Sequence, residues 1–122
     1  MNLKEYFENT QGLGIIASAD AEGKVDTAVY SKPIVMDNDT IAFIMADNLT
    51  HSNVKVNPYT SYMFIEDTSG YKGKRLYLKM TKEETDPEII DKYLDDKRYK
   101  SISKFLVYFH VDNIRPLVGD KA

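Results

Sequence analysis

The sequence contains no cysteine, which excludes disulfide bonds, thiol catalysis and metal sites built on thiolates. It contains only two histidines, His51 and His110, so a zinc or iron site would need mostly carboxylate ligands. A G-x-S-x-G nucleophile elbow is also absent. We therefore expect no metal centre and no hydrolase of the serine or cysteine type.

An excess of positive charge and a long apolar run are lacking as well. The net charge is -3 and the isoelectric point is near 5.3, whereas a general nucleic-acid binder usually has a basic face. No run approaches the roughly 18 apolar residues of a membrane span, and the N-terminal residues are too polar for a signal peptide. We expect a cytoplasmic protein with no nucleic-acid partner and no membrane partner.

The composition is that of one soluble folded domain, which we assign to residues 1–122. Of these residues 43% are hydrophobic and 29% are charged, and we find no internal repeat or low-complexity tract. A chain of this size buries a real core but often leaves an apolar face that needs a partner.

The hydrophobic pattern predicts a mainly β protein. Residues 75–81 alternate, with Leu76 and Leu78 on one face and Arg75 and Tyr77 on the other. Pro33 cannot donate to a strand ladder, so its strand lies at an edge or bulges there. We expect six strands, at residues 13–20, 24–35, 40–46, 60–67, 75–81 and 105–119, and helices at 2–9, 50–57 and 86–99. Since closure removes exposed strand edges, the pattern favours a small antiparallel barrel with peripheral helices.

A polar run, Thr50, His51, Ser52 and Asn53, begins the predicted helix at residues 50–57. Thr50 is a suitable N-cap, which is the simpler explanation of the run. The first N–H groups of a helix also attract anions, and the hydroxyls, the amide, the imidazole and Lys55 suit a phosphate. Both interpretations remain open from the residues alone.

A second candidate anion site is the loop at residues 70–75, where Lys72, Lys74 and Arg75 accompany two glycines. A solvated hairpin tip explains the same residues equally well. A flat aromatic ligand with a phosphate, lying between strands and a partner chain, would explain both polar segments together.

Three long stretches resemble one known family. They are "GIIASADAEGKVDTAVYSKPIVMDNDTIAFIMA", "THSNVKVNPYTSYMFI" and "VYFHVDNIRPLVG". In element order they are similar to the first three strands, the phosphate-binding helix and the closing strand of the pyridoxamine 5'-phosphate oxidase-like FMN-binding split-barrel family. The resemblance covers nearly the whole chain and implies a six-stranded antiparallel split β-barrel that forms a homodimer, with FMN bound at the interface.

The resemblance also implies a set of cofactor-binding residues. The flavin would be lined by Thr27, Ala28, Val29, Tyr30 and Ser31. The isoalloxazine would be bordered by Met45, Ala46 and Asp47. The phosphate would be held by Thr50, His51, Ser52 and Asn53. Lys72, Lys74 or Arg75 and the region 108–110 would contribute from either chain.

The sequence departs from the family pattern in two places. Tyr30, Leu49 and His51 stand where many relatives carry an arginine or lysine for the phosphate, and Lys32 and Lys55 are possible replacements. The chain is also shorter than the true oxidase and lacks its basic C-terminal segment, so we do not expect it to oxidise pyridoxamine phosphate.

These considerations predict an FMN-dependent oxidoreductase of unknown substrate, or a small electron-transfer protein, supplied by a small-molecule or redox-protein electron donor. No catalytic side chain is predicted, because the flavin itself performs the redox step. One alternative is a haem- or deazaflavin-binding module of the same fold, in which Tyr30, His51 or His110 would contact a haem iron. Another is an interaction protein that has lost its cofactor.

Overall fold

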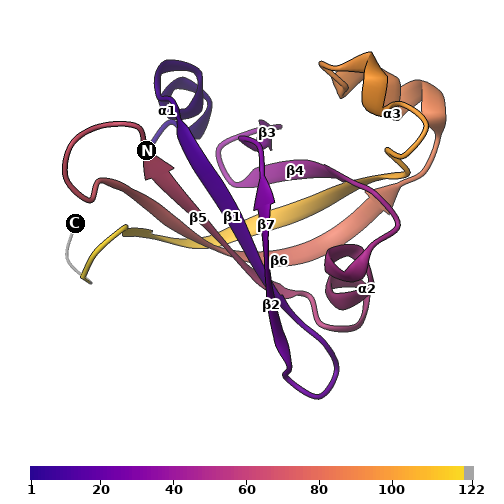
Figure 1. Ribbon diagram of the computed structural model, residues 1–122, viewed down its shortest axis with the longest axis horizontal. Coiled ribbons are helices and arrows are strands. Elements are labelled where there is room, and N and C mark those ends of the chain that lie inside the picture. Colours follow the sequence, from indigo (N-terminus) through magenta and orange to yellow (C-terminus); the bar gives the residue numbers. More distant parts are fainter. Residues whose placement is uncertain (120–122) are drawn as a thin grey trace.

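The computed structural model describes residues 1–119, which form one curled antiparallel sheet with three α-helices (Figure 1). The strands are β1 (Gly12–Ala19), β2 (Val25–Tyr30), β3 (Ile34–Val35), β4 (Thr40–Met45), β5 (Tyr59–Glu66), β6 (Gly73–Glu84) and β7 (Phe105–Pro116). The helices are α1 (Leu3–Asn9), α2 (Leu49–Val56) and α3 (Pro87–Tyr93), and a short 3₁₀ helix covers Lys97–Tyr99.

The strands lie in the order β2-β1-β5-β6-β7-β4-β3, and every neighbouring pair is antiparallel. The two edge strands, β2 and β3, follow one another directly in the sequence. The sheet is therefore curled, and residues 31–33 join its two edges. This arrangement is a split barrel, as the sequence predicts.

The number of strands differs from the prediction, because residues 24–35 form two strands and not one. Pro33 has no N–H to donate and restricts the residue before it, so the ladder cannot continue through this point. The last pair between β1 and β2 joins Gly14 and Tyr30. The sheet therefore has seven strands among residues 1–119, and the expected six-stranded barrel is wrong in this detail.

Aromatic rings fill the core inside the curled sheet. Tyr62 and Phe64 are fully buried, and Phe43 and Phe109 pack with them. Phe7 of α1 completes the group, with its ring 5.2 Å from that of Phe64 in an edge-to-face arrangement. Each such ring buries a large apolar area and pairs favourably with its neighbours, so this cluster accounts for much of the stability of the fold.

The helix predicted at residues 86–99 is shorter than expected. Asp86 caps it by accepting a hydrogen bond from the Glu88 N–H, and Pro87 occupies its first turn, as predicted. The helix ends at Tyr93, because Leu94 has extended backbone angles. The chain from Tyr93, through the 3₁₀ helix, to residue 103 then leads to β7; this segment 93–103 lines the site described below.

No helix among residues 1–119 is long and apolar enough to cross a membrane.

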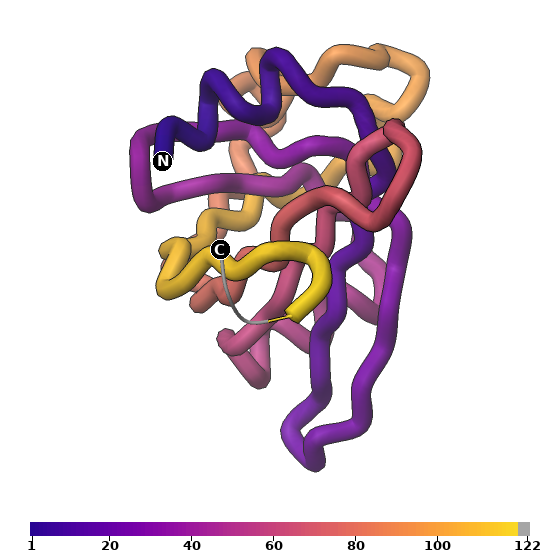
Figure 2. The backbone as a smooth tube through the Cα atoms, turned by 90° about the vertical axis from the view of Figure 1, so that its left-hand side faces the viewer, coloured from indigo at the N-terminus to yellow at the C-terminus, as the bar shows by residue number. Residues whose placement is uncertain are grey.

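In both Figure 1 and Figure 2 the hairpin of β1 and β2 extends beyond the rest of the molecule at one end. At the opposite end of the view α1 covers the core with Leu3 and Phe7.

Candidate cofactor site

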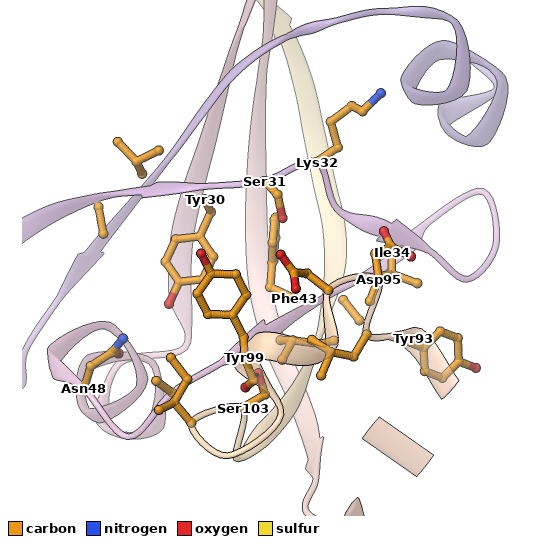
Figure 3. A pocket seen from close by; sticks show the side chains of 18 residues that line it. Tyr30, Ser31, Lys32, Ile34, Phe43, Asn48, Tyr93, Asp95, Tyr99 and Ser103 are labelled. Atoms are coloured by element: carbon orange, nitrogen blue, oxygen red, sulfur yellow. Dashed lines mark hydrogen bonds between the residues drawn. The ribbon is translucent and has the colours of Figure 1, made fainter. Parts of the chain in front are cut away.

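A cavity of about 560 Å³ lies where β2 leaves β1 and approaches β4 (Figure 3). Its volume is in the usual range for a small-molecule site. Three parts of the chain line it: β2 and the residues after it, β4 with the start of α2, and the segment 93–103. The lining residues used below are Ala28, Val29, Tyr30, Ser31, Lys32, Ala46, Asn48, Tyr93, Asp95, Asp96, Tyr99 and Ile102.

The path of the chain along the cavity is fixed by Tyr62, whose side chain is fully buried. Its hydroxyl donates to the Ser31 carbonyl at 3.0 Å, across the sheet from β5. Gly14 makes this approach possible, since a Cβ atom there would collide with the Tyr62 hydroxyl and the Tyr30 carbonyl. Burial raises the pKa of Tyr62, so the phenol stays a neutral donor. Tyr62 and Gly14 therefore hold Ser31 at the edge of the cavity.

The start of α2 forms one end of the cavity. The helix is capped by Asn48, whose side-chain oxygen accepts the His51 N–H at 3.2 Å; the predicted N-cap, Thr50, is two residues too late. Thr50 instead lies near the Tyr30 hydroxyl, as does Asn48, and hydrogen bonding with these two side chains acts to lower the pKa of Tyr30. Burial raises the pKa of Tyr30 more than these bonds lower it. A phenol, an amide and a hydroxyl thus meet at a helix N-terminus that has further unpaired N–H groups.

The His51 side chain lies outside the cavity lining. Its ring stacks on Phe105 with centroids 3.6 Å apart, and its Nε2 is 2.7 Å from Glu83. Lys55 is also within 3.5 Å of Glu83. Burial of Glu83 alone would raise its pKa, but the bonds and charges of His51 and Lys55 outweigh burial, so the pKa is lowered. The two basic side chains among the residues proposed for a phosphate are therefore engaged with one carboxylate.

The other residues of the polar run divide between core and solvent. Asn53 is buried and donates to the Ser18 hydroxyl at 3.1 Å, whereas Ser52 is exposed. Neither lines the cavity.

Of the residues predicted to contact the flavin, some line the cavity and others do not. Residues 28–31 and Ala46 line the cavity. Thr27 and Asp47 are exposed and lie outside its lining, and Met45 is buried in the core. The structure thus brings residues 28–31 and Ala46 together at the cavity with Asn48, which was not predicted, whereas Thr50 is buried behind the lining.

The basic residues lie elsewhere within one chain. Lys74 and Arg75 are at the beginning of β6, whereas Glu83, beside α2, is near its end. Lys72 precedes β6, and residues 108–110 are in the middle of β7. Lys32 lines the cavity, but its ammonium donates to the carbonyls of Phe7 and Thr10 at the end of α1. A role for Lys74 and Arg75 through a partner chain stays a prediction.

The segment 93–103 is the part of the site that sequence reasoning missed. It contributes Tyr93, Asp95, Tyr99 and Ile102 to the cavity. The apolar residues at 86–99 have helical spacing, and this spacing predicts a helix outside the barrel. Residues 93–99 were therefore not considered as part of a site. The available signal was the adjacent pair Asp95 and Asp96, which can cap a new turn, as Asp96 does for the 3₁₀ helix.

Among residues 1–119 no group of three or more histidine and carboxylate side chains is arranged to hold a metal ion.

Comparison with known proteins gives no matching family model and no similar curated protein sequence. Solved structures do match. An FMN-binding protein from Syntrophomonas wolfei superposes with a TM-score of 0.78 at 21% identity, covering 94% of this chain and 83% of that one. A putative pyridoxamine 5'-phosphate oxidase from Lactobacillus delbrueckii gives 0.70 at 16% identity, covering 90% and 87%. The chain has the pyridoxamine 5'-phosphate oxidase-like split-barrel fold.

The same split-barrel fold also occurs in a protein named for haem. HutZ, the haem storage protein from Vibrio cholerae, superposes with a TM-score of 0.65 at 14% identity, covering 92% of this chain and 89% of that one. At these identities the likeness establishes the fold, and structures of this split-barrel fold differ in the ligand for which they are named.

Proposed function

We propose that this protein binds FMN in the cavity beside β2 and transfers hydride or electrons through the flavin. The observation that carries the proposal is the meeting of Tyr30 and Asn48 at the N-terminus of α2, at one end of a cavity lined by β2, with Thr50 buried behind them. Their donors and the unpaired helix N–H groups suit a phosphate, and the cavity beyond them has room for a flat ring. The FMN-binding protein of the same fold supports this choice.

The residues present fit FMN in chemistry as well as in space. The phosphate would be held by neutral hydroxyl and amide donors and by helix N–H groups, and not by a cation, because Lys32, His51 and Lys55 are engaged elsewhere. The backbone of residues 28–31 would border the flavin ring. FMN would supply the redox chemistry when bound, and the protein would bind the flavin, orient it and restrict water around it.

A homodimer would complete the site. Val25 and Val29 on the edge strand β2 are 80% and 70% exposed, and Leu13 on the adjacent β1 is 49% exposed. Exposed apolar side chains at a sheet edge are typical of interfaces. Val29 also lines the cavity, so a second copy packed on this face would border the bound cofactor.

The decisive experiment is an FMN titration of the purified protein, followed by visible absorbance and by quenching of flavin fluorescence. We expect binding near one FMN per chain. Tyr30→Phe removes the phenol that faces the helix start and should weaken binding roughly 10- to 100-fold, since a hydrogen bond to a charged group contributes about 1.5–3 kcal/mol. Tyr59→Phe, at an exposed tyrosine outside the cavity lining, is the matched control. If FMN added in excess shows neither spectral change nor quenching, the proposal is wrong.

Haem is the second candidate, and His110 is the residue that favours it. Its ring is 47% exposed, and its Nδ1 lies 2.7 Å from Asp112, an arrangement common for histidines that ligate metals. The same bond raises the pKa of His110. Because iron needs the neutral imidazole, haem binding through His110 should strengthen as pH rises. A Soret band that is lost in His110→Ala would support haem over FMN.

A further inference from the structure

The segment 93–103 forms one wall of the cavity and has few attachments to the rest of the molecule. Among residues 1–119, every hydrogen bond made by residues 94–103 joins them to one another or to Asp91. The first bond to the sheet comes after the segment, where the Lys104 N–H donates to the Met45 carbonyl at 3.1 Å. No residue of the segment is buried. Neither a buried side chain nor a hydrogen bond therefore fixes this wall to the sheet.

The two ends of the segment are anchored close together. Ile90 of α3, three residues before the segment, is 3% exposed and belongs to one buried cluster with Leu106 of β7. Between these anchors the contacts are local: Asp96 accepts from the Arg98 guanidinium, with Nη2 at 2.7 Å. The same guanidinium lies 5.9 Å from the centre of the Tyr99 ring. Figure 1 shows α3 and the chain after it at one edge of the molecule. A segment that is bonded internally and anchored at neighbouring points can open as a unit.

Two large side chains of the segment line the cavity and are only half covered. Tyr99 is 51% exposed and Ile102 is 53% exposed. Figure 3 shows Tyr99 beside Tyr30, which belongs to the wall formed by β2. Removing apolar surface from water is favourable, so a ligand in the cavity would draw Tyr99 and Ile102 onto its own surface.

We propose that segment 93–103 is a lid that closes over the ligand in the cavity, with Tyr99 and Ile102 as the side chains that contact the ligand. This inference rests on the proposed function, in which that ligand is FMN. Closure buries the two side chains and restricts water around the bound ring, and opening releases the ligand. The donors at the start of α2 are outside the lid, so FMN can bind without closure. The lid therefore mainly slows release.

Hydrogen exchange of the full-length protein, followed by mass spectrometry, tests the lid in two steps. In the free protein, the amides of residues 94–103 should exchange roughly tenfold faster than those in the middle of β6, because opening the segment breaks no bond to the sheet. With saturating FMN, exchange of the same residues should slow about fivefold, as expected for a segment that closes on its ligand. The exposed turn at residues 21–24, outside the cavity lining, should be unchanged.

A substitution in the lid identifies the contact with the ligand. Tyr99→Ala should release FMN about fivefold faster in stopped-flow measurements, the size of one aromatic contact, and FMN should no longer protect residues 94–103 from exchange. Tyr59→Ala, the same change at an exposed tyrosine outside the cavity lining, should alter neither quantity. Equal effects of the two variants overturn the inference.

The outcomes separate the lid from the proposed function. Slow exchange of residues 94–103 in the free protein overturns the lid whichever ligand binds. FMN binding without protection of these residues also overturns the lid and leaves the FMN proposal standing. If FMN does not bind, the FMN proposal is wrong, and haemin replaces FMN in the same comparison. Protection by haemin then supports the lid, and absence of protection refutes it.

Discussion

Replacing Tyr62 by phenylalanine should lower both the stability of the fold and the affinity for the cofactor. The substitution removes one hydroxyl from a fully buried side chain and leaves the Ser31 carbonyl without this donor. Ser31 is exposed at the cavity, so water can reach its carbonyl and the loss is that of one ordinary hydrogen bond, about 0.5–1.5 kcal/mol. With an unfolding entropy of about 2.1 cal/mol/K per residue, a chain of 122 residues has roughly 0.26 kcal/mol/K, so the melting temperature should fall by roughly 2–6 °C.

Tyr6→Phe is the matched control, because it also removes a tyrosine hydroxyl that makes a hydrogen bond. The Tyr6 hydroxyl donates to Glu66 at 2.7 Å, and Tyr6 is only partly buried and lies outside the cavity lining. We expect a smaller loss of stability in this variant and an unchanged dissociation constant for FMN. Melting followed by circular dichroism and FMN titration at 25 °C measure both quantities.

The result for Tyr62→Phe decides whether Tyr62 positions Ser31. We expect FMN to bind several-fold more weakly at a temperature where the variant is fully folded, because Ser31 is then free to shift along the cavity. A variant that melts as Tyr6→Phe does and binds FMN like the wild type would refute the reasoning.

Three further predictions concern other parts of the molecule. Glu83→Gln should be less stable than the wild type at pH 7. The lowered pKa of Glu83 stabilises the fold above the unfolded value of about 4.3, and this contribution is lost as the pH falls through the folded value. The difference in melting temperature between the two proteins should therefore shrink steadily as the pH is lowered below about 4. Gly14→Ala should destabilise the protein by more than about 1 kcal/mol in chemical denaturation, since Tyr62 cannot keep its position; a neutral effect would contradict the close packing. Val29→Glu should shift a homodimer toward monomer in analytical ultracentrifugation, whereas Val118→Glu, equally exposed but beyond the sheet, should not.

Local sequence patterns predict most of the fold because strand alternation and helix capping depend on residues that are close together in the chain. Alternation marked the strands, and Asp86 with Pro87 marked the start of α3. Pro33 indicated an interruption, but the pattern does not reveal that the chain resumes pairing on the opposite edge of the sheet. The pairing of β3 with β4 depends on contacts between distant parts of the chain that form when the sheet curls around the core, so residues near Pro33 do not predict it.

The candidate site was harder to predict for the same reason. Residues 28–31 and Ala46 were found through the family resemblance. His51 is near the helix start, as predicted, but the direction of its ring depends on Glu83 and Phe105, which are 32 and 54 positions away in the chain. The contribution of residues 93–103 depends on where α3 stops, and Leu94 alone does not signal an end.

The short connection across the opening of the barrel has a consequence for how such a protein can change in length. Residues 31–33 are the whole link between the two edges of the sheet, and Ser31 and Lys32 line the cavity. An insertion there would alter the width of the ligand space directly. Insertions at the tips near Gly23 or Gly70 would fall in exposed turns, where extra residues cost little loop entropy. Variation in length among chains of this architecture should therefore collect at the hairpin tips, and a change at the three-residue link should mark a change of ligand.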